Sequence, residues 1–327
     1  MSWLDDLLAG RVLPVVQAPM AGASDTRLAA AVSDAGALGT ISVAYGATAE
    51  SVRTACGELG ERPFGVGLLN WQQLDLPGVL EAVLAHRPSL VSLSFGDPEE
   101  PVRRARAADA SVLLAVQVGT MEEARRALGC GIDLLVARGS EGGGHGRGVV
   151  ATLPLLQQVL EVAGDTPVLA AGGVATGRGL AAVLAAGAVG AWVGTAFTVC
   201  TESPFAPELK AAVIAAGADE TIYSSVFDRA LRLGWPPDHG GRALRNEVTD
   251  GWEGRVDELV ASLAAGDPYR VTERVTAARQ RNDPSEAPVY AGQAVGLLEQ
   301  ERSVAELIAE LATYRDHLSR AVGRLGS

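Results

Sequence analysis

The sequence predicts a (β/α)8 barrel, a TIM barrel, with an inserted, mainly helical second domain. Eight short apolar runs alternate with helical patterns over roughly the first 200 residues. The apolar runs are continuous rather than alternating in polarity, which is typical of parallel strands covered by helices on both faces. A doubly wound open sheet is the alternative that this pattern leaves open, although no glycine-rich dinucleotide fingerprint follows an early strand.

The predicted strands, in chain order, are Val15–Met20, Leu38–Val43, Phe64–Leu69, Leu90–Phe95, Val112–Val118, Leu134–Arg138, Val168–Gly172 and Ala191–Phe197. Between them the predicted helices are Thr26–Asp34, Ala49–Glu58, Gly78–Ala85, Glu100–Ala107, Met121–Leu128, Leu153–Val162 and Gly177–Ala186. Several helices are followed by a glycine that suits a left-handed C-terminal cap, namely Gly36, Gly131 and Gly187.

An uncharged stretch of 23 residues lies between Arg178 and Glu202, long enough to span a bilayer. Glycine interrupts it at Gly187, Gly190 and Gly194, and its periodicity changes from helical to extended. We therefore expect a buried helix and strand of a barrel here and no membrane span.

The composition narrows the class of protein. The 327 residues carry a net charge of −12, which argues against nucleic acid or an anionic membrane as the main partner. The cysteines Cys56, Cys130 and Cys200 are far apart and form no CxxC pair, so neither disulfides nor a metal site are expected. The N-terminus lacks the basic segment of a signal peptide, and we expect a cytoplasmic protein.

Three regions are expected: a barrel over 1–204, an inserted lid or substrate domain over 205–288, and a C-terminal helix over 289–327 that packs back on the barrel. The terminal helix would present one apolar face, made of Val304, Leu307, Ile308, Leu311, Leu318, Val322 and Leu325. In the inserted region, Trp235, Trp252 and Tyr269 are interpreted as a small core in preference to the wall of a substrate pocket.

His145 is the candidate catalytic residue. It lies in the loop Gly139–Gly148 after the sixth strand, and reactive groups of such barrels lie at the carboxyl ends of strands. Gly143 and Gly144 precede it and let the backbone approach a flat ligand or an anion closely. His86 and His317 fall in helical patterns, and His239 falls in a loop of the second region.

Further candidate residues follow other strands. Gly172 and Gly173 end the seventh strand and Gly194 and Thr195 the eighth, where barrels commonly bind phosphate through backbone N–H groups. Gln117 is a polar residue in the apolar fifth strand, and its amide needs a partner that a ligand or a neighbouring loop could supply.

These segments together resemble the nitronate monooxygenase family, formerly called 2-nitropropane dioxygenases. The matching pieces are Gln17–Gly22, Gly142–Gly146, Ala170–Val174, Gly194–Phe197, Gly241–Asn246 and Tyr290–Gly296. The resemblance covers almost the whole chain in order, and the glycine–histidine loop is its most specific piece.

The resemblance implies an FMN-dependent enzyme that oxidises alkyl nitronates with O2 to a carbonyl compound and nitrite. Ala18, Pro19 and Met20 would lie against the isoalloxazine, and His145 would orient the nitronate or remove a proton from a neutral nitroalkane. The expected phosphate grip consists of Gly172, Gly173, Gly194, Thr195 and Ala196.

The chain departs from the family pattern at two positions. Many members carry asparagine where this chain has Gly67, with Asn70 three residues on, and many carry glutamine where it has Arg138. We hypothesise that Arg138 lies near the pyrimidine edge of the flavin, where its charge would favour the reduced form. An ion pair between Arg138 and Glu141 is the alternative.

Two other functions stay open on the sequence. A flavin-dependent enoyl-acyl-carrier-protein reductase has a similar Glu-x-Gly-Gly-His loop and requires NAD(P)H, and a non-redox phosphate-binding barrel enzyme would lack the flavin. The expected partners are a small-molecule substrate and O2, while the oligomeric state, a homodimer included, is not decided by the sequence.

Overall fold

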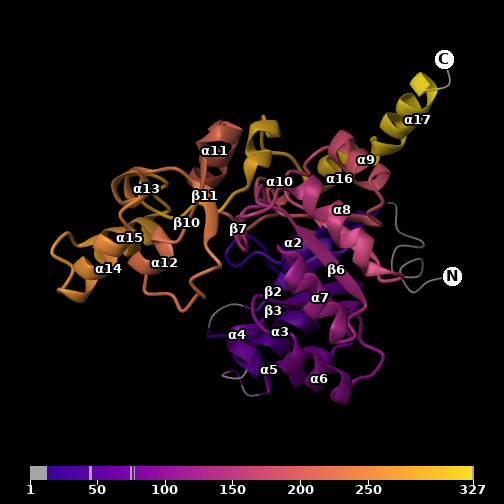
Figure 1. Ribbon diagram of the computed structural model, residues 1–327, viewed down its shortest axis with the longest axis horizontal. Coiled ribbons are helices and arrows are strands. Elements are labelled where there is room, and N and C mark those ends of the chain that lie inside the picture. The colour runs from indigo at the N-terminus through magenta and orange to yellow at the C-terminus, as the bar shows by residue number, and fades with distance from the viewer. Residues whose placement is uncertain (1–12, 44–45, 74–75, 77, 326–327) are drawn as a thin grey trace.

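The structure is a computed structural model that describes residues 13–43, 46–73, 76 and 78–325. Eight parallel strands form one sheet in the order β1-β9-β8-β6-β5-β4-β3-β2, surrounded by helices (Figure 1). The strands are β1 Val15–Gln17, β2 Gly39–Ser42, β3 Phe64–Leu69, β4 Leu90–Ser94, β5 Leu114–Val118, β6 Leu134–Arg138, β8 Val168–Ala171 and β9 Gly190–Val193. All eight predicted strands are therefore confirmed.

The sheet closes into a barrel. Its two outer strands, β1 and β2, meet at a parallel bridge between Val16 and Leu38. The Gln17 N–H donates to the Leu38 carbonyl at 2.9 Å, and the Leu38 N–H donates to the Val15 carbonyl at 3.0 Å. Because no long gap is left between these strands, the predicted (β/α)8 barrel is confirmed and the open doubly wound sheet is wrong.

The helices around the barrel are α2 Thr26–Asp34, α3 Ala49–Leu59, α4 Asn70–Gln73, α5 Val79–Leu84, α6 Glu99–Ala108, α7 Met121–Gly129, α8 Thr152–Ala163 and α9 Gly177–Ala185. Side chains of Thr48, Thr120 and Thr176 cap three of them by accepting a hydrogen bond from a backbone N–H. The predicted cap glycines Gly36 and Gly187 have φ of 90° and 106°, which is the left-handed conformation expected there.

Several predicted strand boundaries were wrong: β1 ends at Gln17 instead of Met20, β5 begins at Leu114 instead of Val112, and the end of β9 differs most. Strand β9 ends at Val193, and Thr195–Thr198 form a short helix, α10, in place of the predicted extension to Phe197. Gly194 separates the two elements and turns the chain at the barrel mouth. The uncharged stretch before Glu202 thus contains part of α9, strand β9 and α10, and none of the described helices is long and apolar enough to cross a bilayer.

The second region is mainly helical, as predicted, but it also contains strands that the sequence did not reveal. Its elements are α11 Pro207–Ala215, η1 Ala218–Glu220, β10 Thr221–Ser224, α12 Val226–Ala230, β11 Gly241–Leu244, α13 Glu247–Trp252, α14 Val256–Ala264 and α15 Val271–Arg281. Strand β11 pairs with β10 on one side and with β7, Gly144–His145, on the other, and β7 belongs to the glycine–histidine loop of the barrel. The register sets Gly241 opposite His145, so the two regions share a small antiparallel sheet beside that histidine.

The C-terminal segment forms two helices instead of the single one predicted. After η2 Gln293–Leu297, helix α16 spans Val304–Ala312 and helix α17 spans Tyr314–Leu325. Residues of α16 are buried against the barrel, and α17 also packs on the barrel helix α9, while the C-terminal end of α17 projects away from the barrel at the yellow end of the chain (Figure 1). Val322 is 69% exposed, so its predicted place on a buried face is wrong, and the side chain of Leu325 lies outside the described part.

Candidate active site

A cavity of about 640 Å³ opens at the carboxyl ends of the barrel strands. Residues in or just after each of the eight strands line it, and the second region supplies the opposite wall. Among the lining residues are all but one of the residues predicted from the sequence: Ala18, Pro19, Met20, Gln117, Arg138, Gly143, Gly144, His145, Gly172, Gly173, Gly194 and Thr195. Ala196 is the exception, because it is completely buried behind the wall.

Three side chains hold His145, two from the second region and one, Tyr290, from the C-terminal segment. Its Nε2 lies 2.8 Å from Oδ1 of Asp228, a carboxylate that is only 3% exposed. The ring of Trp235 is stacked on the imidazole, with centroids 3.7 Å apart and planes 1° apart. The ring of Tyr290 lies 5.0 Å away at a tilt of 49°. The imidazole is therefore fixed in position and in plane at the cavity wall.

The hydrogen bond to Asp228 also determines which imidazole nitrogen carries hydrogen. An ionised carboxylate can only accept a hydrogen bond, so the hydrogen lies on Nε2 of His145. Among the described residues, Nδ1 has no hydrogen-bond partner. This nitrogen is available to a ligand as an acceptor of a hydrogen bond or of a proton.

Tyr290 carries a second buried polar group in this cluster. Its hydroxyl is inaccessible to solvent and lacks a hydrogen bond of ordinary geometry to the described residues. Burial, together with the nearby Asp228 carboxylate, raises the pKa of Tyr290 well above its usual value. The hydroxyl consequently stays protonated at physiological pH.

The aromatic residues of the second region divide differently from the prediction. Trp235, which we interpreted as core, lines the cavity and contacts Phe95 edge-on at 5.1 Å. Phe95 follows β4 with a φ of 65°, a costly conformation for a non-glycine residue that is often found at functional sites. Trp252 and Tyr269 lie 5.5 Å apart and away from the cavity, but Tyr269 is 61% exposed, so its prediction as a core residue is wrong.

Arg138 shapes the glycine–histidine loop. Its guanidinium donates to the carbonyl oxygens of Gly143 at 3.2 Å, Gly144 at 2.8 Å and Arg147 at 3.0 Å, and it also bonds to the carbonyl of Gly142. The side chain is buried, and burial lowers its pKa to about 10, so it remains charged at neutral pH.

The alternative ion pair between Arg138 and Glu141 is wrong for the described chain. The Glu141 carboxylate instead accepts hydrogen bonds from the N–H of Thr152 at 2.7 Å and from its hydroxyl at 2.8 Å. No Arg138–Glu141 contact within ion-pair distance is formed in this part of the structure.

The two turns after β8 and β9 offer donors for an anion. The backbone N–H groups of Gly173, Gly194, Thr195 and Ala196 have no acceptor among the described residues. Gly173 has a φ of 75°, and a Cβ there would meet nothing closer than 3.9 Å, which leaves the turn open on its outer side. The hydroxyl of Thr195 accepts from the Gly292 N–H at 2.9 Å and keeps its own hydrogen for a ligand. These groups fit a phosphate.

Close packing explains the departure at Gly67. A Cβ at this position would lie 2.4 Å from Cγ of Pro19, so any larger residue would displace the turn after β1. Asn70 does not replace the missing asparagine on the cavity wall: it is buried outside the lining, and its amide has no hydrogen bond to the described residues.

Polar groups also line the floor near β4 and β5. Ser92 and Ser94 are buried 2.9 Å apart, and the Ser94 hydroxyl accepts from the Gln117 N–H at 3.1 Å. The side-chain amide of Gln117 makes no hydrogen bond within the described residues and faces the cavity wall. The amide of Gln117 is therefore free to form a hydrogen bond with a ligand, and no neighbouring loop among the described residues supplies that partner.

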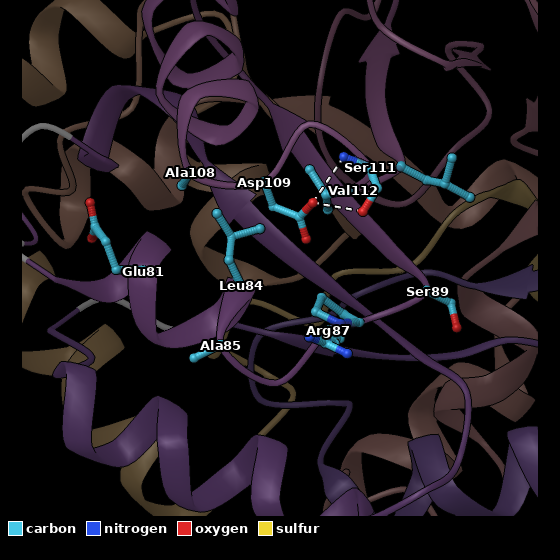
Figure 2. Close-up of a pocket in the computed structure, with 11 residues that line it drawn as sticks. Glu81, Leu84, Ala85, Arg87, Ser89, Ala108, Asp109, Ser111 and Val112 are labelled. Atoms are coloured by element: carbon cyan, nitrogen blue, oxygen red, sulfur yellow. Dashed lines mark hydrogen bonds between the residues drawn. The ribbon is translucent and has the colours of Figure 1, made fainter.

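A larger hollow of about 830 Å³ lies elsewhere, among the loops before β4 and β5 (Figure 2). Its Asp109 carboxylate is already bonded to the N–H and hydroxyl of Ser111 at 2.8 and 2.6 Å, as the dashed lines in Figure 2 show. This hollow is at the amino ends of the strands, where barrels of this kind do not place their catalytic groups. Across the described residues, no cluster of side chains could hold a metal ion in either place.

Comparisons with known proteins identify the family of the chain. The family model for nitronate monooxygenase matches residues 6–79 and 78–313. A nitronate monooxygenase from Neurospora crassa is 31% identical over 343 residues, covering 91% of this chain and 87% of the relative. Two other curated relatives are matched over only 65% and 62% of their own length.

Solved structures resemble the chain over its whole length. A nitroalkane oxidase from Streptomyces ansochromogenes has a TM-score of 0.79 and 29% identity, with 99% of this chain and 100% of that chain covered. FabK from Thermotoga maritima has a TM-score of 0.79 and 27% identity, with 99% and 98% covered.

Proposed function

Because this chain belongs to the nitronate monooxygenase family of flavin-dependent enzymes, we propose that it binds FMN and oxidises alkyl nitronates with O2 to a carbonyl compound and nitrite. The observation that carries the proposal is the His145–Asp228 pair at the wall of a glycine-lined cavity. The free Nδ1 of this imidazole can accept a proton from a neutral substrate or, once protonated, donate a hydrogen bond to an anionic one.

The cavity fits FMN in its two characteristic parts. The free N–H groups after β8 and β9, with the hydroxyl of Thr195, would hold the phosphate. The apolar turn of Ala18, Pro19 and Met20 would lie against the ring system. When bound, FMN supplies the redox chemistry, and the protein supplies binding and orientation.

His145 would act on the substrate in one of two ways. With a nitronate, which is already an anion, an imidazole that carries a second hydrogen on Nδ1 would orient an oxygen of the nitronate, while its Nε2 hydrogen stays on Asp228. With a neutral nitroalkane, Nδ1 would take the proton from the carbon next to the nitro group. Asp228 would stabilise the resulting imidazolium, and Trp235 and Tyr290 would keep the ring in place and exclude water.

The experiment is an absorbance spectrum of the purified protein, followed by anaerobic mixing with ethyl nitronate. Yellow protein that is bleached by the nitronate and regains its colour with O2 is the expected result. His145→Gln should keep the colour and lose the bleaching. His239→Gln is the matched control, because His239 is also buried and bonded to an aspartate but does not line the cavity. Colourless protein that FMN cannot reconstitute would contradict the proposal.

A flavin-dependent enoyl reductase is the second candidate, favoured by the sequence Glu141-Gly142-Gly143-Gly144-His145. Such an enzyme requires NAD(P)H. The same anaerobic experiment with NADPH in place of the nitronate distinguishes the two, since bleaching by NADPH alone would favour the reductase.

A further inference from the structure

A short segment of the chain connects the proposed reaction centre with the turn proposed to hold the phosphate. This crossing segment, Val289–Gln293, runs from the loop after α15 to the first residue of η2. Val289, Ala291 and Gly292 are buried. The backbone of the crossing segment contacts three separate parts of the molecule: β11, the glycine–histidine loop and the turn after β9.

The N-terminal half of the crossing segment belongs to the reaction centre. The carbonyl of Val289 accepts a hydrogen bond from the Leu244 N–H at 2.9 Å, and Tyr290 forms an antiparallel bridge with Ala243. The ring of Tyr290 lies 5.0 Å from the ring of His145. The position of this ring beside the imidazole therefore depends on where the backbone of the crossing segment lies.

The C-terminal half of the crossing segment is bonded to two barrel loops. The Gln293 N–H donates to the carbonyl of Glu141 at 2.9 Å. The Gly292 N–H donates to the hydroxyl of Thr195 at 2.9 Å. Thr195 is the first residue of α10, and it is one of the groups proposed to hold the phosphate. The same hydroxyl thus faces the phosphate turn and the crossing segment.

The contact at Gly292 is tight. A Cβ at this position would lie 2.5 Å from the carbonyl oxygen of Glu141 and 2.6 Å from the backbone nitrogen of Gly143. Since a closely packed interior transmits small displacements, a shift of Gly292 also moves the loop that carries His145. One residue, Ala291, separates Gly292 from Tyr290.

We propose that Thr195 is a positioning residue that couples the phosphate turn to the reaction centre, because its hydroxyl donates to the cofactor phosphate and accepts from Gly292. The inference rests on the phosphate part of the proposed FMN site and is independent of the nitronate chemistry. A hydroxyl that donates to an anion becomes a stronger acceptor, since linked hydrogen bonds polarise one another. Phosphate at this turn therefore strengthens the bond to Gly292 and holds the ring of Tyr290 at the reaction centre.

The hydroxyl can be removed without removing the other phosphate donors. The backbone N–H groups of Gly173, Gly194, Thr195 and Ala196 have no acceptor among the described residues, and they stay in place when the side chain changes. Thr195→Val, which has nearly the same shape, should therefore still take up FMN at a higher concentration. Thr195→Ser keeps the hydroxyl and serves as the conservative variant.

The test is hydrogen exchange, followed by mass spectrometry, of a peptide that contains Gly292, in free protein and in protein saturated with FMN. We expect FMN to slow exchange of the Gly292 amide about tenfold in the wild type and in Thr195→Ser. In Thr195→Val this FMN-dependent slowing should be lost. Thr201→Val is the matched control, because its hydroxyl bonds the carboxylate of Glu202 and Thr201 does not line the cavity.

A hydroxyl with a purely structural role would give a different result. Thr195→Val would then speed exchange at Gly292 equally in the free and the loaded protein, and the FMN-dependent difference would stay as in the wild type. That outcome would overturn the proposal.

Inorganic phosphate distinguishes the coupling from simple coverage of the segment by the flavin ring, because phosphate has no ring. We expect phosphate to slow exchange at Gly292 in the wild type and in Thr195→Ser, and to have no effect in Thr195→Val. If FMN binds and neither ligand produces a slowing that depends on the Thr195 hydroxyl, the inference alone is overturned. A wild type that takes up neither FMN nor phosphate would overturn the proposed cofactor site together with the inference.

Discussion

Asp228→Asn tests the central element of the proposed site, because it removes one negative charge at nearly constant volume. Asp228 is 3% exposed and accepts a hydrogen bond from Nε2 of His145 at 2.8 Å. The amide can still accept through its oxygen, but it no longer stabilises the positive charge that the imidazole gains when it takes a proton.

The size of the effect follows from the type of bond that is lost. A hydrogen bond to a charged group contributes about 1.5–3 kcal/mol. Since about 1.4 kcal/mol corresponds to a factor of ten, a step in which His145 becomes charged should slow by roughly 10- to 150-fold. A step in which the charge of His145 does not change should slow much less.

Two substrates separate these steps. Nitroethane still carries the proton that a base must remove, whereas ethyl nitronate has already lost it. We expect Asp228→Asn to lower kcat/KM for nitroethane by roughly 10- to 150-fold and for ethyl nitronate by no more than a few fold. Asp238→Asn is the control, because this carboxylate also bonds a histidine, His239, but is 56% exposed and does not line the cavity.

Equal losses with the two substrates would refute this reasoning and leave Asp228 with a purely structural role. Failure of the wild type to consume nitroethane, with ethyl nitronate still oxidised, would refute the role of His145 as a base. Circular dichroism and the flavin spectrum of each variant would show whether the fold and the cofactor are retained.

Other perturbations give equally definite expectations. Gly67→Ala should displace Pro19, because the Cγ of Pro19 would lie 2.4 Å from the new Cβ, and it should weaken FMN binding in a fluorescence titration. Gly57→Ala is the control: its Cβ meets nothing within 4 Å, so FMN affinity should stay unchanged and the free energy of unfolding should rise by about 0.5–1 kcal/mol. Tyr290→Phe should change the free energy of unfolding by less than about 1 kcal/mol in urea titration, because the hydroxyl makes no hydrogen bond of ordinary geometry; a larger loss would reveal an ordered partner. Burial raises the pKa of Cys200 to about 12, so its thiolate is scarce at pH 8 and it should react with a disulfide reagent only after unfolding; rapid reaction in the native state would contradict its burial.

The barrel could be predicted because its information is local. Each strand is a short apolar run, each helix is bounded by a cap or a glycine, and eight such units have few ways to pack. The prediction failed at Gly194, where the chain turns and the apolar run continues as a helix instead of a strand. It also missed β10, Thr221–Ser224, and β11, Gly241–Leu244, which are only four residues long and carry no clear pattern. They pair with each other, and β11 pairs in addition with a two-residue segment far away in the chain.

The candidate site could be predicted only for residues that follow a barrel strand. Groups that follow a strand, such as His145 and Gly173, could be placed by their position alone. Asp228 could not, because it is 83 residues from His145 and stands in a short helix where an aspartate is ordinarily a surface residue. Trp235 was assigned to a small core for a related reason, since only the fold shows that its loop covers the barrel mouth.

Arg138 and Gln117 show why residue type alone does not assign a role. Arg138 was the more conspicuous in the sequence, at the end of a barrel strand, yet its donors are engaged by the carbonyl oxygens of the loop that carries His145. Its charge therefore stabilises the shape of that loop. Gln117 could be assigned either to a ligand or to a neighbouring loop, and its amide is free for a ligand. The availability of hydrogen-bonding groups, which only the three-dimensional structure reveals, is what distinguishes a residue that builds this cavity from one that can bind what enters it.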